Sequence, residues 1–431
     1  MAVREIQPAA GPVTGTVRPP GSRSLTNRAL VIAALADGRS DLTDVGLSDD
    51  TRVCAEALRT LGLRVETDEA GRRMRVEGCG GRVPPGPADL FTGDSGTATR
   101  FVTALVAAGH GRYRIDGSPR MRERPIQDLL EGLGQLGVRA ESEAGTGCPP
   151  VVVETEGLAG GRISLAGAVS SQYLSGLLMA APAGRAPLAI AVRGELVSKP
   201  YIDMTLTVMR DFGLQVEREA YAAFVVPAPR AYRARTYAVE PDAASASYFL
   251  AAAAATGGRV TVEGLARQSP QGDARFADVL REMGCTVRWS AAGVTVEGPA
   301  HLRGVQVDLN DMPDMVLTLG PLALLAQGRT IIENVGNLRV KESDRLAALA
   351  AELTRLGAKV QERPDGLTIW PPPEVRPAEV RTYGDHRMAM GLAAVGLRVP
   401  GLRIAGAECV SKTYPEFFED LERLVRGGRG P

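Results

Sequence analysis

Lysine is rare in this chain, and its positions point to chemistry. Only four of the 50 lysine and arginine residues are lysines. Three of them, Lys199, Lys341 and Lys412, lie beside hydroxyls or carboxylates in the segments VSKPY, RVKESDR and VSKTYP. A lysine is a compact charge that can exchange a proton, whereas arginine is a rigid and strongly basic fork. These segments predict anion binding combined with proton transfer; the alternative is three surface lysines without a function.

Hydroxyls and glycines precede several apolar segments of helical length. Residues 19–28 read PPGSRSLTNR, in which Ser22 or Ser24 can cap the helix that follows. Residues 93–100 read GDSGTATR, and glycine lets a phosphate approach the backbone closely. Free amides and the helix dipole at such starts attract anions. Taken alone, residues 93–100 fit a capped glycine turn equally well, and no glycine is followed by the lysine of a Walker loop.

Carboxylates join the cations in the second half of the chain. Asp314 lies in NDMPDMV before an apolar helix, where it could simply cap that helix. Lys341, Glu342 and Arg345 stand at helical spacing, which predicts Lys341 and Arg345 on one helix face. His386, alone in YGDHRM, is expected to be structural. Because cations and hydroxyls recur at helix starts, the expected ligands are small and carry several carboxylate or phosphate groups.

Composition excludes several other classes of protein. The 50 acidic and 50 basic residues cancel, so there is no electrostatic footprint for nucleic acid or an anionic membrane. The longest apolar stretch, 248–255, is far shorter than the roughly 20 residues of a membrane span, and the N-terminal sequence lacks a signal-peptide core. Five scattered cysteines predict reduced thiols in the cytoplasm. The three histidines have no metal-ligand spacing, so no metal or other cofactor is expected.

An internal repeat must position these residues. Five related segments carry a shared glycine at intervals of 71–76 residues, at Gly62, Gly137, Gly213, Gly284 and Gly357. Each glycine is expected to end an amphipathic helix in the left-handed conformation, and a strand follows. A sixth helix is expected around Phe417. A second kind of helix is apolar on nearly all sides and should be buried, at 24–37, 96–108, 170–181, 243–256, 315–326 and 388–396.

The pattern predicts an α/β protein of six βαβαββ-like repeats, with three repeats in each of two domains. Prolines near residues 20 and 241 mark the predicted hinge. The first domain would comprise residues 22–241, and the second would comprise 1–21 and 242–431. Binding sites favour clefts between domains, so the polar helix starts are expected to face such a cleft.

The motifs together resemble the 5-enolpyruvylshikimate-3-phosphate synthase family over essentially the whole chain. The resemblance is carried by PGSRSLTNRAL, GDSGTATR, RMRERP, VSSQ, ELVSKPYID, DASASYFLAA, NLRVKESDR, DHRMAM and SKTYP. It implies transfer of the enolpyruvyl group of phosphoenolpyruvate to the 5-hydroxyl of shikimate 3-phosphate, with release of phosphate by addition and elimination. It also implies an inverse α/β barrel that closes on substrate. The expected protein is a monomer whose partners are these two small molecules, without nucleic acid or membrane.

By position, the resemblance assigns residues to each substrate. Shikimate 3-phosphate would be held by Arg23, Ser24, Arg28, Ser170, Ser171, Gln172, Ser198, Tyr201, Asp314, Asn337 and Lys341. Phosphoenolpyruvate would be held by Arg23, Gly96, Arg124, Gln172, Arg345, Arg387 and Lys412. Asp314 and Glu342, with the residue at position 23, would carry the protons as catalytic residues, while the arginines stabilise developing charge.

Two residues depart from the family pattern, which usually has lysine at the position of Arg23 and asparagine at that of Asp94. Arginine is a poor proton donor, so any proton-transfer role of the family lysine would be lost or would pass to Glu342. It would also reshape the pocket for phosphoenolpyruvate and for glyphosate, an inhibitor that resembles this substrate. These departures keep open a catalytically silent anion-binding protein on the same fold. The other alternative is a UDP-N-acetylglucosamine enolpyruvyl transferase, but the loop at 110–124 lacks that family's reactive cysteine.

Overall fold

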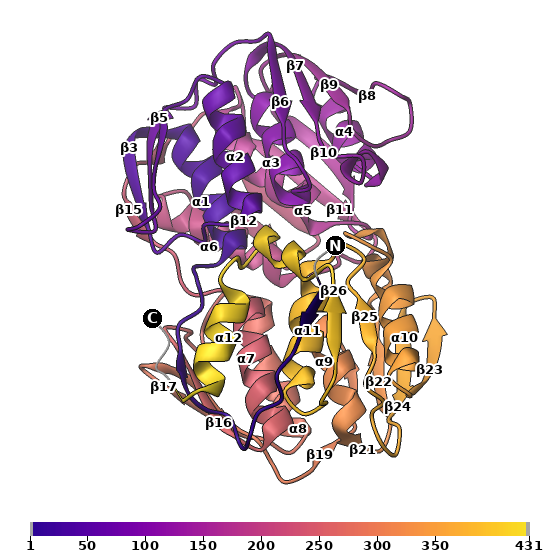
Figure 1. The fold of residues 1–431 in the computed structure, drawn as a ribbon. Coiled ribbons are helices and arrows are strands. Elements are labelled where there is room, and N and C mark those ends of the chain that lie inside the picture. The colour runs from indigo at the N-terminus through magenta and orange to yellow at the C-terminus, as the bar shows by residue number, and fades with distance from the viewer. Residues whose placement is uncertain (1–2, 428–431) are drawn as a thin grey trace. The chain divides into compact units, whose positions relative to one another are not determined.

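The computed structural model describes residues 3–427, and its contacts divide the chain into two compact units. The middle unit comprises residues 21–240, and the terminal unit comprises residues 1–20 and 241–431. In Figure 1 the indigo strand near the N-terminus lies among orange and yellow elements of the terminal unit. The chain therefore begins in the terminal unit, builds the middle unit and returns.

One pairing pattern recurs in the three sheets of the middle unit. Counted in spatial order, the first strand pairs in parallel with the second, the second pairs antiparallel with the third, and the third pairs antiparallel with the fourth. The sheets, each written in spatial order, are β15 (Thr236–Ala238), β3 (Ala36–Thr43), β5 (Arg73–Cys79) and β4 (Val65–Asp68), with β14 (Tyr232–Arg233) also beside β3; β6 (Ala88–Phe91), β7 (His110–Asp116), β9 (Val151–Glu156) and β8 (Arg139–Ser142); and β10 (Gly161–Ala166), β11 (Leu188–Arg193), β13 (Ala223–Val226) and β12 (Glu217–Glu219).

The terminal unit repeats the pattern. Its sheets are β2 (Thr14–Val17), β16 (Arg259–Glu263), β18 (Gly293–Glu297) and β17 (Thr286–Ser290); β20 (Gln306–Asp308), β22 (Thr330–Glu333), β24 (Gly366–Trp370) and β23 (Lys359–Arg363); β25 (Glu379–Arg381), β26 (Arg403–Ala405) and β1 (Val3–Glu5); and the pair β19 (Leu302–Arg303) and β21 (Ala326–Gln327). In the sixth repeat, β1 pairs antiparallel with β26 and so takes the place of the third strand in spatial order.

Each repeat contributes one inner and one outer helix. The inner helices are α1 (Arg23–Leu35), α3 (Gly96–Val106), α5 (Ser171–Ala180), α7 (Ala243–Thr256), α9 (Val316–Leu322) and α11 (His386–Gly396). The outer helices are α2 (Asp49–Thr60), α4 (Gln127–Gly134), α6 (Pro200–Asp211), α8 (Phe276–Glu282), α10 (Arg345–Arg355) and α12 (Phe417–Val425). In each unit the inner helices contact one another and form the centre of a single hydrophobic core (Figure 1).

The predicted α/β repeats are confirmed, with small differences at helix ends. All five shared glycines have a left-handed φ of 79–103°, and Gly427 (φ 75°) ends the sixth outer helix in the same way. The inner helix predicted at 24–37 ends at Leu35, because Ala36 is extended and starts β3. The helix predicted at 315–326 is regular only to Leu322, since Pro321 lacks the N–H that a longer helix requires. Within residues 3–427, no helix has the length and hydrophobicity needed to cross a membrane.

Candidate active site

A buried network of charges in the terminal unit is centred on Arg345. This arginine is 1% exposed and contacts three carboxylates: Nη1 lies 2.7 Å from Asp314 Oδ1, Nη2 lies 2.9 Å from Glu342 Oε2, and Nε lies 2.7 Å from Asp385 Oδ2. Burial alone would lower the pKa of Arg345, but attraction to these carboxylates outweighs burial and raises the pKa. The guanidinium therefore stays charged, with its desolvation compensated by direct partners.

Two further cations extend the network. Arg387 Nη2 lies 2.7 Å from Asp314 Oδ2, and Lys412 Nζ lies 3.0 Å from Glu342 Oε1. Arg387 Nη1 also lies 3.2 Å from the hydroxyl of Tyr248, whose pKa burial raises to about 12. Cations and carboxylates thus alternate from Lys412 through to Arg387. An anion that enters here can bind these cations in place of the carboxylates. The carboxylates then lie close enough to the bound anion to exchange protons with it.

Helix starts position this network. Asp314 lies in the 3-10 turn η4 (Pro313–Met315), directly before α9, and Arg345 is the first residue of α10. Arg387 is the second residue of α11, and Lys412 ends the 3-10 segment η7 (Ala407–Lys412), which packs on α11. Asp385 caps α11 by accepting a hydrogen bond from the backbone N–H of Arg387 at 3.0 Å. The positive ends of three helices therefore add to the local attraction for anions.

Two expectations about this region are wrong. Lys341 and Glu342 are not helical, because the 3-10 segment η6 (Gly336–Val340) ends before them and Asp344 caps α10 at Arg345. Glu342 reaches Arg345 from the irregular stretch between η6 and α10. Asp314 does not cap α9, since both of its oxygens bind arginines. Of the other predicted residues, Asn337 lies in η6 and Lys341 follows it, both half-buried.

In the middle unit, Arg28 of α1 is buried and donates hydrogen bonds to groups of α1, α5 and α6. Its Nε donates to Thr205 Oγ1 at 2.8 Å, and its Nη2 and Nη1 donate to the carbonyls of Tyr201 and Ser24 at 3.0 Å and 2.9 Å. Burial lowers its pKa to about 10. Among residues 3–427, no carboxylate forms an ion pair with Arg28. The cation is therefore uncompensated within the unit, which favours an anion nearby.

Hydrogen bonds bring the starts of the inner helices of this unit together. The N-caps of α1, α3 and α5 are Ser22, Ser95 and Ser170. Gln172 Nε2 donates to Thr97 Oγ1 at 3.0 Å and so joins the first turns of α5 and α3. Arg28 Nη2 donates to Ser175 Oγ at 3.4 Å and joins α1 to α5. The predicted Ser171 is buried in the first turn of α5, and the predicted Ser198 is buried with a left-handed φ of 56°.

Two guanidinium groups lie close to Gly96 at the start of α3. A Cβ at this position would lie 2.2 Å from Arg100 Nη1 and 2.7 Å from Arg124 Nη2. Both arginines are buried, at 4% and 6% exposed, so neither can swing freely into solvent. Arg100 also donates to the Pro125 carbonyl at 2.7 Å. A side chain at position 96 would therefore displace these two guanidinium groups.

Arg23 and Asp94, the two residues that depart from the family pattern, each form a hydrogen bond with a neighbouring side chain. Arg23 donates to Asp50, which is buried in the first turn of α2, and Asp94 accepts from the hydroxyl of Ser118. Asp50 and Asp385 were not among the residues predicted from the sequence. The signal for each was an aspartate at the start of a helix, which usually indicates capping or dipole compensation. Lys199, in contrast, forms a surface pair with Glu195 at 3.0 Å.

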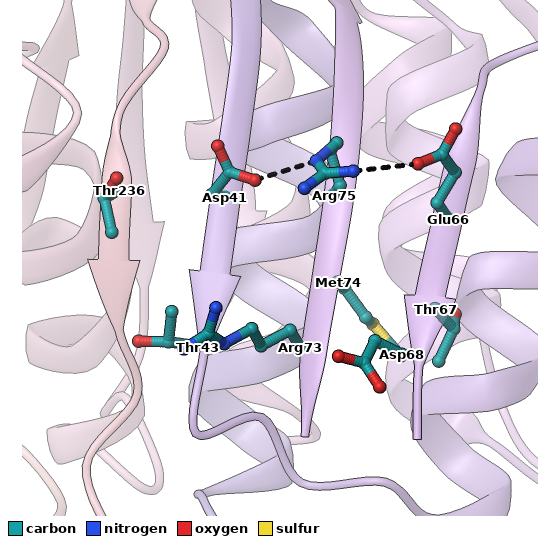
Figure 2. Close-up of a pocket in the computed structure, with 9 residues that line it drawn as sticks. All are labelled: Asp41, Thr43, Glu66, Thr67, Asp68, Arg73, Met74, Arg75 and Thr236. Atoms are coloured by element: carbon teal, nitrogen blue, oxygen red, sulfur yellow. Dashed lines mark hydrogen bonds and ion pairs between the residues drawn. The ribbon is translucent and has the colours of Figure 1, made fainter. Parts of the chain in front are cut away.

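A separate cavity of about 510 Å³ lies on the sheet β15–β3–β5–β4 (Figure 2). Arg75 Nε donates to Asp41 at 2.9 Å and Arg75 Nη1 donates to Glu66 at 3.2 Å, as the dashed lines show. These three side chains are each 39–46% exposed, and they compensate one another. None of the predicted site residues lines this cavity. It is the solvated face of a sheet, and chemistry is expected at the helix starts instead.

Comparisons with known proteins agree on one family. A family model for EPSP synthase (3-phosphoshikimate 1-carboxyvinyltransferase) matches residues 8–421. The chain is 46% identical to the chloroplastic 3-phosphoshikimate 1-carboxyvinyltransferase of Solanum lycopersicum, covering 96% of this chain and 83% of the relative. It is 45% identical to the enzyme of the same name from Trichormus variabilis, covering 96% and 97%.

Solved structures give the same fold. EPSP synthase from Acinetobacter baumannii has a TM-score of 0.82 and 25% sequence identity, with 100% of this chain and 98% of that chain covered. The enolpyruvyl transferase NikO from Streptomyces tendae has a TM-score of 0.79 and 22% identity, with 98% and 97% covered, and shows likeness of fold alone. The predicted fold class is confirmed.

Proposed function

The chain belongs to the EPSP synthase family, and from this premise we propose which of its residues carry the reaction. The protein transfers the enolpyruvyl group of phosphoenolpyruvate to the 5-hydroxyl of shikimate 3-phosphate and releases phosphate, as a step of the shikimate pathway. Its substrates are small molecules with several negative charges, which agrees with the cations at the helix starts. The relatives at 45–46% identity over 96% of the chain disfavour the UDP-sugar alternative.

The proposed phosphoenolpyruvate ligands of the terminal unit are Arg345, Arg387 and Lys412. Support comes from their burial in one network and from the point-like charge of Lys412 at its edge. In the middle unit the proposed ligands of phosphoenolpyruvate are Arg23, Gly96, Arg124 and Gln172. Arginine and lysine can stabilise the charge that develops on carboxylate and phosphate oxygens without any change in their own protonation.

Shikimate 3-phosphate is assigned to a second set. In the middle unit it comprises Arg23, Ser24, Arg28, Ser170, Ser171, Gln172, Ser198 and Tyr201, and in the terminal unit Asp314, Asn337 and Lys341. The uncompensated charge of Arg28 and the serine hydroxyls at the start of α5 support a phosphate here. Arg28 has its own hydrogen bonds to the protein, so it would act mainly through its charge.

Asp314 and Glu342 are proposed to move the protons. The 5-hydroxyl loses a proton as its oxygen attacks C2, and C3 gains one to become a methyl group. That methyl group returns a proton as phosphate leaves. Each carboxylate is held by two cations, so its oxygens are fixed in orientation. Arg23 would stabilise charge rather than donate a proton. The observation that carries the proposal is that the Glu342 carboxylate forms ion pairs with both Lys412 and Arg345.

Phosphate release from phosphoenolpyruvate should require shikimate 3-phosphate and no added metal. Within residues 3–427, no group of three His, Cys, Asp or Glu side chains is arranged to hold a metal ion. Phosphate release is measured with each substrate alone, with both, and with both after dialysis against a chelator. UDP-N-acetylglucosamine replaces shikimate 3-phosphate in the control. Loss of activity on chelation, or turnover with the UDP-sugar, would contradict the assignment.

Replacing Gly96 by alanine should raise the KM for phosphoenolpyruvate by roughly 10- to 100-fold, because the methyl group displaces Arg100 and Arg124 from their positions. The matched control is Gly134→Ala in α4, where an added Cβ meets nothing within 4 Å. Its kinetics should be those of the parent protein. If Gly96→Ala leaves that KM unchanged, these arginines tolerate displacement and Gly96 does not set the site.

The remaining proposals concern where and in what form the protein works. We propose a cytoplasmic monomer that binds neither nucleic acid nor membrane. All five cysteines are free thiols, which supports a reducing compartment. The formal net charge of zero supports the absence of a polyanionic partner. Size-exclusion chromatography with light scattering tests the monomer, for which a mass near 45.4 kDa is expected.

A further inference from the structure

The turn that leads into α11 holds a tyrosine in an unfavourable backbone conformation. Tyr383 has a φ of 56° and Gly384 a φ of 70°, and Asp385 N donates to the Thr382 carbonyl at 2.9 Å to close the turn. Glycine adopts this left-handed region freely, whereas a bulky aromatic residue does so rarely. Such a conformation persists where surrounding structure enforces it, and it often marks a functional constraint.

An equivalent turn in the middle unit shows what the backbone alone would need. The turn from Thr92 to Ser95 leads into α3, and Ser95 N donates to the Thr92 carbonyl at 3.1 Å. The hydroxyls of Thr92 and Thr382 each donate to the carbonyl of the last residue of the neighbouring strand, β7 or β26, at 2.9 Å and 3.1 Å. The position of Tyr383 is occupied here by Gly93, with a φ of 55°. Glycine suits this turn, so the tyrosine is present for its side chain.

The side chain of Tyr383 is held by a buried carboxylate. Its hydroxyl donates to Glu352 Oε1 at 2.8 Å, and Arg355 Nε donates to Glu352 Oε2 at 3.0 Å. Glu352 is 0% exposed, whereas Tyr383 is 44% exposed, so burial does little to fix the ring. The hydroxyl bond is therefore the anchor of the tyrosine. Neither residue has a part in the proton transfers or the substrate contacts described above.

Helix α10 thus binds the turn at two points. Glu352 lies seven residues, or about two helical turns, beyond Arg345 and on the same face of α10. Glu352 accepts a hydrogen bond from the Tyr383 hydroxyl, and Arg345 Nε donates a hydrogen bond to Asp385 at 2.7 Å. Asp385 in turn accepts from the backbone N–H of Arg387. Through Asp385, one short turn therefore contacts both Arg345 and the start of α11 that carries Arg387.

We propose that Tyr383 is a positioning residue for phosphoenolpyruvate binding. Its bond to Glu352 holds the turn from Thr382 to Asp385, and through Asp385 it aligns Arg345 and Arg387 toward the anion. The inference rests on the proposed function, because it assigns these arginines to phosphoenolpyruvate. Tyr383 itself is not assigned a contact with substrate.

Two substitutions separate positioning from stability. Tyr383→Phe removes the hydroxyl and keeps the backbone strain, whereas Tyr383→Gly removes both. Both variants should raise the KM for phosphoenolpyruvate roughly tenfold, the scale of one hydrogen bond lost from a buried acceptor, with the KM for shikimate 3-phosphate unchanged. Tyr383→Gly relieves the backbone strain that Tyr383→Phe keeps, so it should unfold at a higher urea concentration than Tyr383→Phe. A merely structural tyrosine would leave the KM for phosphoenolpyruvate unaltered in both variants, whatever the change in the unfolding midpoint.

A matched control and a conservative substitution of Glu352 complete the test. Tyr221→Phe removes a hydroxyl that likewise donates to a carboxylate, Asp203, which likewise pairs with an arginine, Arg218. This variant should keep the parent kinetics. Glu352→Gln retains an acceptor for Tyr383 and loses only the partly exposed pair with Arg355, so the KM for phosphoenolpyruvate should stay within about twofold.

The outcomes distinguish this inference from the proposed function. If the parent protein releases no phosphate with both substrates, the proposed function itself fails. If the parent is active and Tyr383→Phe and Tyr383→Gly both keep the parent KM for phosphoenolpyruvate, the positioning role is overturned while the proposed function stands. An equal rise for the control Tyr221→Phe would also overturn it, because the effect would then not depend on this turn.

Discussion

Glu342→Gln and Asp314→Asn should each lower kcat by roughly 10²-fold or more, the usual scale for the loss of a general acid or base. Both substitutions keep the shape of the side chain and remove a carboxylate that stands between two cations. The kcat for phosphate release, measured at saturating concentrations of both substrates, tests this directly. The affinity for shikimate 3-phosphate, measured by calorimetry, should change much less.

The matched control for this prediction is Asp311→Asn. Asp311 lies in the same short segment as Asp314 but is 43% exposed at its side chain, and its partner Arg275 is 3.3 Å away at the surface. Its loss should leave kcat unchanged. If Asp314→Asn behaves like Asp311→Asn, or if Glu342→Gln keeps near-native turnover, that carboxylate only holds the arginines in place and carries no proton.

Arg345→Gln should lower the free energy of unfolding by about 3–5 kcal/mol, because it leaves Asp314, Glu342 and Asp385 without their shared cation in a buried position. Urea unfolding monitored by circular dichroism measures the loss. The substitution should also abolish measurable saturation by phosphoenolpyruvate. Folded variant protein, verified by its circular dichroism spectrum, is used for the kinetic measurement.

Arg339→Gln is the matched control for stability. Arg339 also pairs with two carboxylates, Asp344 and Glu362, at 2.9 Å and 2.8 Å, but its side chain is 27% exposed. Exposed pairs contribute about 0–1 kcal/mol each, so this variant should remain close to the parent. An equal loss of unfolding free energy in the two variants would mean that water also solvates the carboxylates around Arg345, and that the network is not buried.

The fold could be predicted from the sequence because its signals are local and repeated. Each shared glycine ends an outer helix through its own left-handed conformation, and each inner helix is apolar on nearly all sides. The strand β1 could not be placed in this way, because three residues carry no local signal of their pairing with β26. The hinge near residues 20 and 241 and the closure on substrate stay predictions.

The site was predictable only in part. Its cations stood out because lysine is rare and because Arg345 and Arg387 lie at helix starts. The aspartates that bind these cations could not be recognised, because Asp50 and Asp385 have the sequence signature of ordinary helix starts. Only their contacts with Arg23 and Arg345 distinguish them. The helical spacing assigned to Lys341 failed because Asp344 starts α10 later than periodicity alone suggests. The tie between Tyr383 and Glu352 joins residues 31 positions apart and has no local signal.

The central claim is that phosphate leaves only as the enolpyruvyl group is transferred to shikimate 3-phosphate. Nuclear magnetic resonance with phosphoenolpyruvate labelled with ¹³C at C2 follows both fragments in one tube. The predicted result is an enol ether on the 5-oxygen of shikimate 3-phosphate in an amount equal to the phosphate released. Labelled pyruvate in place of the enol ether would show hydrolysis without transfer, and no change with both substrates present would show a silent protein; either result would contradict the account.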